Sequence, residues 1–138
     1  MTLFPDLNVE ETKINVKILL SQYRRMQRLV TEGHMPKITQ TYTLEPRSAS
    51  LDNDQTFDSV SRKMTAEDEL TKIAEALNKL NAYHRQLVYY RYMVKERMTD
   101  EDISGIMSMS ERTYYRELET TLIEFAEAYD GGSLLADK

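Results

Sequence analysis

The sequence predicts an all-α protein, and two observations support this prediction. Apolar residues recur at helical spacing near the N-terminus and again from residue 70 onward. Each apolar stretch is preceded by an Asn, Ser or Thr. The side chains of these residues can accept hydrogen bonds from the free N–H groups at the start of a helix. These predicted N-cap residues are Asn8, Thr65, Asn81, Thr99 and Ser110.

A long basic helix is expected near the N-terminus. Asn8 can cap it at Val9, and the two acids that follow favour the positive end of the helix dipole. Its apolar positions, at near-heptad spacing, are Val16, Leu19, Leu20, Tyr23, Met26 and Val30. Gly33 and Pro36 are expected to end the helix. Because such a stripe needs burial, we expect it to dock on the C-terminal part of the chain or to form a homodimer with a second copy.

The segment from Pro36 to Lys63 is polar and rich in Ser, Thr, Asp and Asn, which is typical of a linker. Within it, the stretch "KITQTYTLEP" alternates and favours a short extended piece. The expected organisation is therefore an N-terminal basic amphipathic helix over residues 1–35, a polar linker over 36–63 and a helical domain over 64–138.

Four helices are expected after the linker. The first begins at Thr65, with Asp68 in a capping-box arrangement. Its apolar stripe consists of Leu70, Ile73, Ala74, Leu77 and Leu80. Asn81 caps the second helix, Thr99 a short third helix and Ser110 a long fourth helix. The residues expected to face inward on the short helix are Ile103, Ile106 and Met107.

The last two helices have the spacing of a helix-turn-helix. Ser104 is small enough to let the helices approach closely, Ser108 stands at the turn, and Tyr114 is the first core residue of the second helix. A residue other than glycine that is forced to positive φ in this turn costs roughly 1 kcal/mol. In such a pair the N-terminal turns of the second helix enter the major groove of DNA.

The exposed side of this second helix is expected to carry arginine. The residues expected on its buried side are Tyr114, Leu118, Leu122, Phe125 and Tyr129. Thr113, Arg116 and Thr120 then point away from the core, while Arg112 lies beside them and Tyr115 at the edge. The fork of an arginine fits guanine O6 and N7, and it fits phosphates equally. The alternative is a helix pair that serves packing alone.

The net charge of −5 does not favour nucleic-acid binding, but the charge is unevenly distributed. Residues 1–65 carry nine Lys or Arg and eight Asp or Glu, a net charge of +1. Residues 66–138 carry nine Lys or Arg and fifteen Asp or Glu, a net charge of −6. Because non-specific affinity for DNA comes from neutralising phosphates, the acidic C-terminal half weighs against tight binding.

The composition excludes several classes of site. There is no cysteine, and the two histidines are far apart in sequence, so we expect neither a disulfide framework nor a metal site. The acidic run from Asp100 to Asp102 favours helix capping over Mg²⁺ binding, and His84 is expected to be solvated or to contact a phosphate. No catalytic motif and no cofactor-binding loop is present, so the protein is not expected to be an enzyme.

We expect a cytoplasmic protein that has no membrane partner. No apolar run approaches the length that spans a bilayer, and the acidic N-terminal stretch lacks the apolar region of a signal peptide.

The stretch "LNAYHRQLVYYRYM" is similar to the first helix of the helix-turn-helix in sigma-factor region 4, where Leu, Arg, an apolar pair and an Arg-aromatic pair recur. The matching residues are Leu80, Arg85, Leu87, Val88, Arg91 and Tyr92. The similarity implies a sigma region 4-like helix-turn-helix domain, joined here to a long N-terminal helix and a polar linker.

More closely, the whole chain resembles the ArpU family of phage and prophage transcriptional regulators. The stretches that carry the resemblance, in order, are "NVKILLSQYRRMQRL", "PKITQTYTLEP", "EDELTKIAEALNKL", "MTDEDISGIMSMSERTYYREL" and "LIEFAEAYDGGSLL". The resemblance implies control of the late genes, for packaging, morphogenesis and lysis, in phages of Gram-positive bacteria. It also implies binding of double-stranded DNA through residues 99–129. The expected contact residues are Ser110, Glu111, Arg112, Thr113, Tyr115 and Arg116.

Three functions are compatible with these features. The first is sequence-specific binding of duplex DNA to regulate phage late transcription. The second is an adaptor whose acidic helices dock on host RNA polymerase, with DNA contact secondary. The third is a packaging component similar to a terminase small subunit. The third function predicts a ring of many copies, whereas the first two predict a monomer or dimer, so the molar mass in solution distinguishes them.

Overall fold

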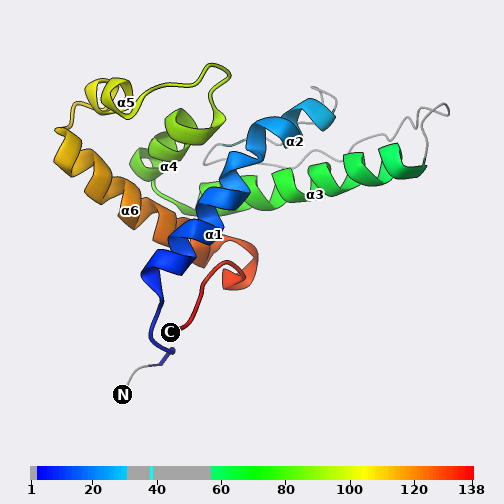
Figure 1. Ribbon diagram of the computed structural model, residues 1–138, viewed down its shortest axis with the longest axis horizontal. Coiled ribbons are helices and arrows are strands. Elements are labelled where there is room, and N and C mark those ends of the chain that lie inside the picture. Colours follow the sequence, from blue (N-terminus) through cyan, green and yellow to red (C-terminus); the bar gives the residue numbers. More distant parts are fainter. Residues whose placement is uncertain (1–2, 31–37, 39–56) are drawn as a thin grey trace.

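Helices form the regular structure of the described chain. The computed structural model describes residues 3–30, 38 and 57–138 (Figure 1). The elements in order are α1 (Val9–Ser21), α2 (Tyr23–Leu29), α3 (Phe57–Lys79), α4 (Ala82–Val88), the π-helical turn η2 (Tyr89–Met93), α5 (Asp100–Ile106), α6 (Glu111–Ala128) and the 3-10 turn η3 (Asp130–Gly132). The predicted all-α class is confirmed. No helix among these elements is long and apolar enough to cross a membrane.

The N-terminal helix begins where the sequence predicts, but it is not continuous. The Asn8 side chain accepts a hydrogen bond from the N–H of Glu11 at 3.1 Å, which caps α1. The helix is interrupted at Gln22, and α2 then ends at Leu29, so the prediction of one unbroken helix is wrong. The interruption lets α1 lie across α6 while α2 follows α3 (Figure 1). The predicted ending at residues 33 and 36 lies outside the described residues.

The predicted docking of the N-terminal stripe is confirmed. α1 packs on α6 and α2 packs on α3. The buried side chains of the stripe are Val16, Leu20, Tyr23, Met26 and Val30. These side chains are covered by their own chain, whereas Ile14 and Ile18 of α1 are exposed, so the homodimer through the N-terminal helix stays a prediction.

The helix predicted to begin at Thr65 begins eight residues earlier. α3 starts at Phe57, and Thr65 is an exposed residue inside it, so the predicted capping box is wrong. No glycine or proline lies between Phe57 and Thr65 to stop the helix, although the segment is polar. The predicted linker boundary at residue 63 therefore falls within α3, and the extended piece expected around residues 37–46 lies outside the described residues except for Ile38. The three-part domain division stays a prediction.

α3 supplies the centre of the core. Leu70, Ile73, Ala74 and Leu77 are at most 1% exposed, which confirms the predicted stripe. Leu70, Ile73 and Leu77 belong to a single cluster with the buried residues of α1, α4, α5 and α6. At the C-terminal end of α6, the Tyr129 hydroxyl donates a hydrogen bond to the Glu69 carboxylate and so ties this end to α3.

The N-terminal and C-terminal segments are joined by a contact that no motif in the sequence predicts. Leu7 and Asp137 form an isolated antiparallel bridge, and the N–H of Asn8 donates to the carbonyl of Ala136 at 2.8 Å (Figure 1). The N–H of Ala136 in turn donates to the hydroxyl of buried Thr12 at 3.0 Å. The tail after α6 therefore holds α1 in place on α6.

Candidate nucleic-acid interface

The short helix α5 starts at its predicted cap. The Thr99 hydroxyl accepts a hydrogen bond from the N–H of Asp102 at 3.1 Å. Ile103 is buried and Met107 is half-buried, as expected, whereas the inward orientation predicted for Ile106 is wrong because this side chain is 54% exposed. A helix of this length has room on its buried side for few side chains, and Ser104 is the other residue buried there.

The turn between α5 and α6 is a Schellman motif. The N–H of Met109 donates to the carbonyl of Ser104 at 2.9 Å, and the N–H of Ser108 donates to the carbonyl of Gly105 at 3.1 Å. These two bonds require a left-handed residue between the helices, and Ser108 has a φ of 57°. The positive φ expected at Ser108 is therefore confirmed, and the turn directs α6 away from α5 at a defined point.

The start of α6 is held by its own side chains. The Ser110 hydroxyl accepts a hydrogen bond from the N–H of Thr113 at 3.2 Å and donates one to the Thr113 hydroxyl at 3.1 Å. The buried side matches the predicted set of Tyr114, Leu118, Leu122, Phe125 and Tyr129. The first turn of α6 is therefore rigidly placed even though much of it is exposed.

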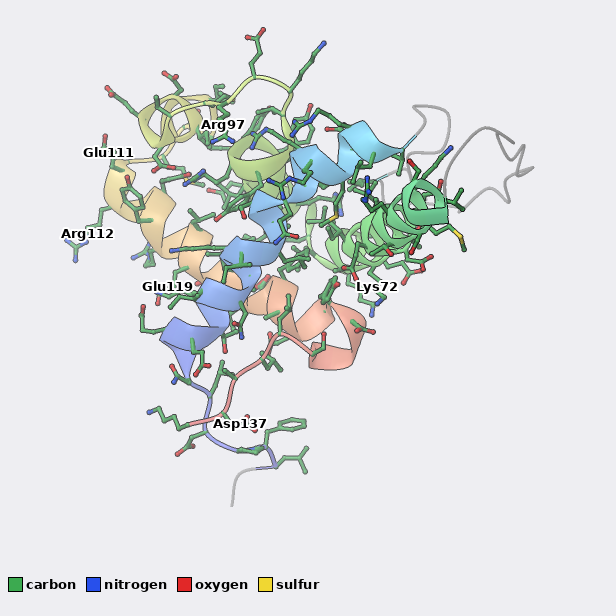
Figure 2. All side chains as sticks on the ribbon, turned by 45° about the vertical axis from the view of Figure 1, so that its right-hand side comes forward. Lys72, Arg97, Glu111, Arg112, Glu119 and Asp137 are labelled. Carbon is green, nitrogen blue, oxygen red and sulfur yellow. The ribbon has the colours of Figure 1, made fainter. Side chains whose placement is uncertain are left out.

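The predicted contact residues lie together at the tip of α6. Exposed residues of this set are Ser110, Glu111, Arg112, Tyr115 and Arg116, and Thr113 is half-buried. Figure 2 shows Glu111 and Arg112 at the outer end of the helix, with Arg112 pointing away from the rest of the molecule. Neither Arg112 nor Arg116 has a salt bridge with any residue that the structure describes. Two guanidinium groups are therefore presented without an acidic partner in this part of the chain.

A polar network around the half-buried Asp100 joins α5 to α6. The hydroxyl of Tyr114 donates to Asp100 Oδ1 at 2.6 Å, and Arg91 Nε of η2 lies 3.1 Å from the same oxygen. The hydroxyl of Tyr115 donates to Asp100 Oδ2 at 3.3 Å. Burial and then the hydrogen bond to Asp100 raise the pKa of Tyr114, so its hydroxyl stays protonated and remains a donor. The sequence pattern favours a helix-capping role for Asp100 and does not predict this network.

The histidine and acids of the domain lie in surroundings that differ from expectation. His84 is 8% exposed. Its Nδ1 lies 2.6 Å from Glu124 Oε1, and its Nε2 lies 3.1 Å from Glu117 Oε2. The prediction of a solvated or phosphate-contacting histidine is therefore wrong. A third α6 acid, Glu119, forms a salt bridge with Lys13 of α1 at 3.3 Å (Figure 2). Three of the acids of α6 are thus in contact with side chains of α1 and α4.

Among the described residues, no group of three or more His, Cys, Asp or Glu residues is arranged to hold a metal ion. The exposed acids near the tip are Glu101 and Asp102 of α5 and Glu111 of α6. Together with the exposed arginines of α6, they make this end of the molecule mixed in charge.

Comparison with known proteins gives two relatives that span the whole chain. An Enterococcus hirae protein is 30% identical over 138 residues, covering 100% of both chains. A protein of Streptococcus phage O1205 is 28% identical over 138 residues, covering 99% of both chains. Both carry, provisionally, the name autolysin regulatory protein ArpU. No family model matches the chain. No solved structure matches it significantly.

Proposed function

Because the chain belongs to the ArpU family, we propose that it is a transcriptional regulator that binds duplex DNA through α5 and α6 and controls phage late genes. The names of the two relatives describe regulators and not enzymes, and one relative is encoded by a phage. Regulation of an autolysin, which the names of these relatives state, is compatible with control of genes for lysis.

The observation that carries the proposal is the pair of exposed arginines at the tip of α6, which have no salt bridge to any described residue. The buried side of α6 already accounts for its packing, and neither Arg112 nor Arg116 contributes to it. The preceding turn, with Ser108 at positive φ, and the Asp100 network hold this tip in one orientation. A rigid helix tip with exposed guanidinium groups is the arrangement by which helix-turn-helix proteins reach base edges in the major groove.

Selection from a random duplex library tests the proposal, because it requires no assumed operator sequence. The full-length protein should enrich a defined sequence, and Arg116→Ala should lose preference at one base position of that sequence. Mapping of the protein on the phage genome during the lytic phase should then place it before late operons. Enrichment of no sequence by the full-length protein would contradict the proposal.

The exposed acids at the same end favour a second candidate function, an adaptor for RNA polymerase. Glu101, Asp102 and Glu111 would repel DNA phosphates but would suit a basic protein surface. Purified polymerase should then bind the full-length protein, and Glu101→Lys with Asp102→Lys should abolish the complex. The same pair of substitutions should strengthen DNA binding if DNA is the partner instead.

A further inference from the structure

A hollow of about 520 Å³ lies between α2 and the segment that leads into α5. Its charged lining residues are all basic: Arg24, Arg25, Arg28, Lys95 and Arg97. We call it the basic hollow. A chain with a net charge of −5 therefore gathers five cations around one depression, while the one acid in the 94–97 segment, Glu96, does not line it.

The described part of the chain does not neutralise these cations. No salt bridge joins any of the five to a described residue. Arg24 Nε donates to the carbonyl of Val94 at 2.9 Å, which joins the two sides of the hollow. A terminal nitrogen of the same guanidinium, Nη2, is buried and has no hydrogen-bond acceptor among the described residues. A buried charged donor without an acceptor is destabilising, so an anion that reaches it would stabilise the protein.

The crowding of like charges supports the same conclusion. Burial, and then the positive charges of Arg97 and Arg91, lower the pKa of Arg24. Residues that repel one another in this way are held together by the packing of α2 and η2 and not by their own attraction. An anion between them would relieve the repulsion.

The position of the hollow relates it to the helix pair. Lys95 and Arg97 stand directly before α5, which begins at Asp100. Figure 2 shows Arg97 in the same upper half of the view as Glu111 and Arg112. In a helix-turn-helix the first helix crosses the DNA backbone, so the residues that lead into its N-terminus approach the phosphates. The first turn of α5 carries acids, and the basic hollow is the neighbouring surface that can offset them.

We propose that the basic hollow binds phosphate groups, and that the sugar-phosphate backbone of duplex DNA supplies them while α6 enters the major groove. The assignment of DNA as the source rests on the proposed function, whereas the phosphate chemistry rests on the hollow itself. Half or more of the hydrogen bonds between proteins and DNA go to phosphate and sugar, and arginine and lysine provide many of them. The hollow adds affinity without adding sequence preference.

The test uses the full-length protein and the double variant Arg28→Ala/Arg97→Ala, which removes one cation from each side of the hollow. Arg24 is left intact because it joins the two sides. Lys72→Ala is the charge control, since Lys72 lies on α3 and does not line the hollow (Figure 2). Arg97→Lys is the control that keeps the charge. Binding is measured over a salt series to a mixed-sequence duplex, and separately to inorganic tripolyphosphate by calorimetry.

The double variant should bind the duplex at least tenfold more weakly at low salt. The salt slope should fall by about one for each phosphate that the variant no longer neutralises. Lys72→Ala and Arg97→Lys should keep the slope of the parent. Tripolyphosphate should bind the parent and not the double variant.

Other outcomes separate this inference from the proposed function. If the parent binds the duplex and the double variant binds it with equal affinity and slope, the hollow does not contact DNA and the inference is overturned while the proposed function stands. If the parent binds no duplex, the proposed function fails, and loss of tripolyphosphate binding in the double variant would then identify a small phosphate compound as the source. Absence of tripolyphosphate binding, or binding of poly-glutamate in its place, overturns the phosphate assignment.

Discussion

The hydroxyl of Tyr114 donates a hydrogen bond to Asp100 over 2.6 Å and joins the first turn of α6 to the first turn of α5. Tyr114 has no exposed surface, and Arg91 lies 3.1 Å from the same carboxylate oxygen. The two helices proposed to contact DNA are therefore held by a partly buried, charge-assisted hydrogen bond, in addition to the turn between them.

Tyr114→Phe should lower the free energy of unfolding by about 1–3 kcal/mol, because it removes a hydrogen bond to a charged group without creating a cavity. Urea denaturation measures the change. Tyr115→Phe is the matched control, since its longer bond of 3.3 Å comes from a side chain that is 52% exposed. A larger loss in Tyr115→Phe than in Tyr114→Phe would contradict the assigned network.

Arg116→Ala and Arg112→Ala should have different effects on DNA binding. Arg116 lies on the second turn of α6, and we expect it to contact a guanine edge and to contribute roughly 1–3 kcal/mol of discrimination. Arg112 lies at the start of the helix, and we expect a phosphate contact whose loss weakens all sequences alike and lowers the salt slope by about one. Binding of each variant to the selected site and to a scrambled site, over a salt series, measures both effects. Equal binding by both variants and the parent would favour the polymerase adaptor.

Leu118→Ala and Phe125→Ala should each destabilise the protein by about 2–5 kcal/mol, because both side chains lie in the core. Phe125 has no exposed surface and Leu118 is 8% exposed, so Phe125→Ala should be the larger loss. Thermal and urea denaturation measure the loss of stability in each variant and so give their order. Thr120→Ala, at an exposed position of the same helix, should change stability far less, and the reverse order would mean that the orientation of α6 is wrong.

Ser108→Gly should leave stability unchanged or raise it by up to about 1 kcal/mol, because glycine adopts positive φ without a steric penalty. Ser108→Val should lower stability by more than about 1 kcal/mol, since a β-branched side chain is strained in this conformation. The two variants differ mainly in the backbone strain at residue 108, and urea denaturation compares their free energies of unfolding. Equal stabilities of the two variants would show that the φ of 57° at this turn is incorrect.

Stability should fall at alkaline pH through Tyr23. Burial, with electrostatic repulsion by Tyr89 as a second cause, raises the pKa of Tyr23 from 10.0 to about 12. Its contribution is therefore complete below pH 10, the ordinary value in the unfolded chain, and is lost as the pH rises toward 12. Denaturation from below pH 10 up to pH 12 should show a shallower decline in Tyr23→Phe than in the parent. An identical decline in the two proteins would rule out this contribution.

The sequence predicted the first residue of a helix correctly wherever a side chain caps that helix. Asn8, Asn81, Thr99 and Ser110 each accept a hydrogen bond from a backbone N–H three residues later. The buried and exposed sides of α6 were also predictable, since both follow from helical periodicity within one element. Thr65 failed as a cap because no glycine or proline between Phe57 and Thr65 stops a helix that has already begun.

What the sequence by itself determined is the set of local choices: helical class, most caps, the left-handed Ser108 and the arginines exposed on α6. The tertiary structure decided the partners. His84 meets Glu124 across 40 residues, and Arg24 meets Val94 across 70 residues, so neither contact leaves a periodic signal in the chain. The basic hollow arises in the same way, because two basic segments become one site only when α2 packs against η2. Local hydrogen bonds depend on neighbours in sequence, whereas charge clusters depend on how the helices are packed.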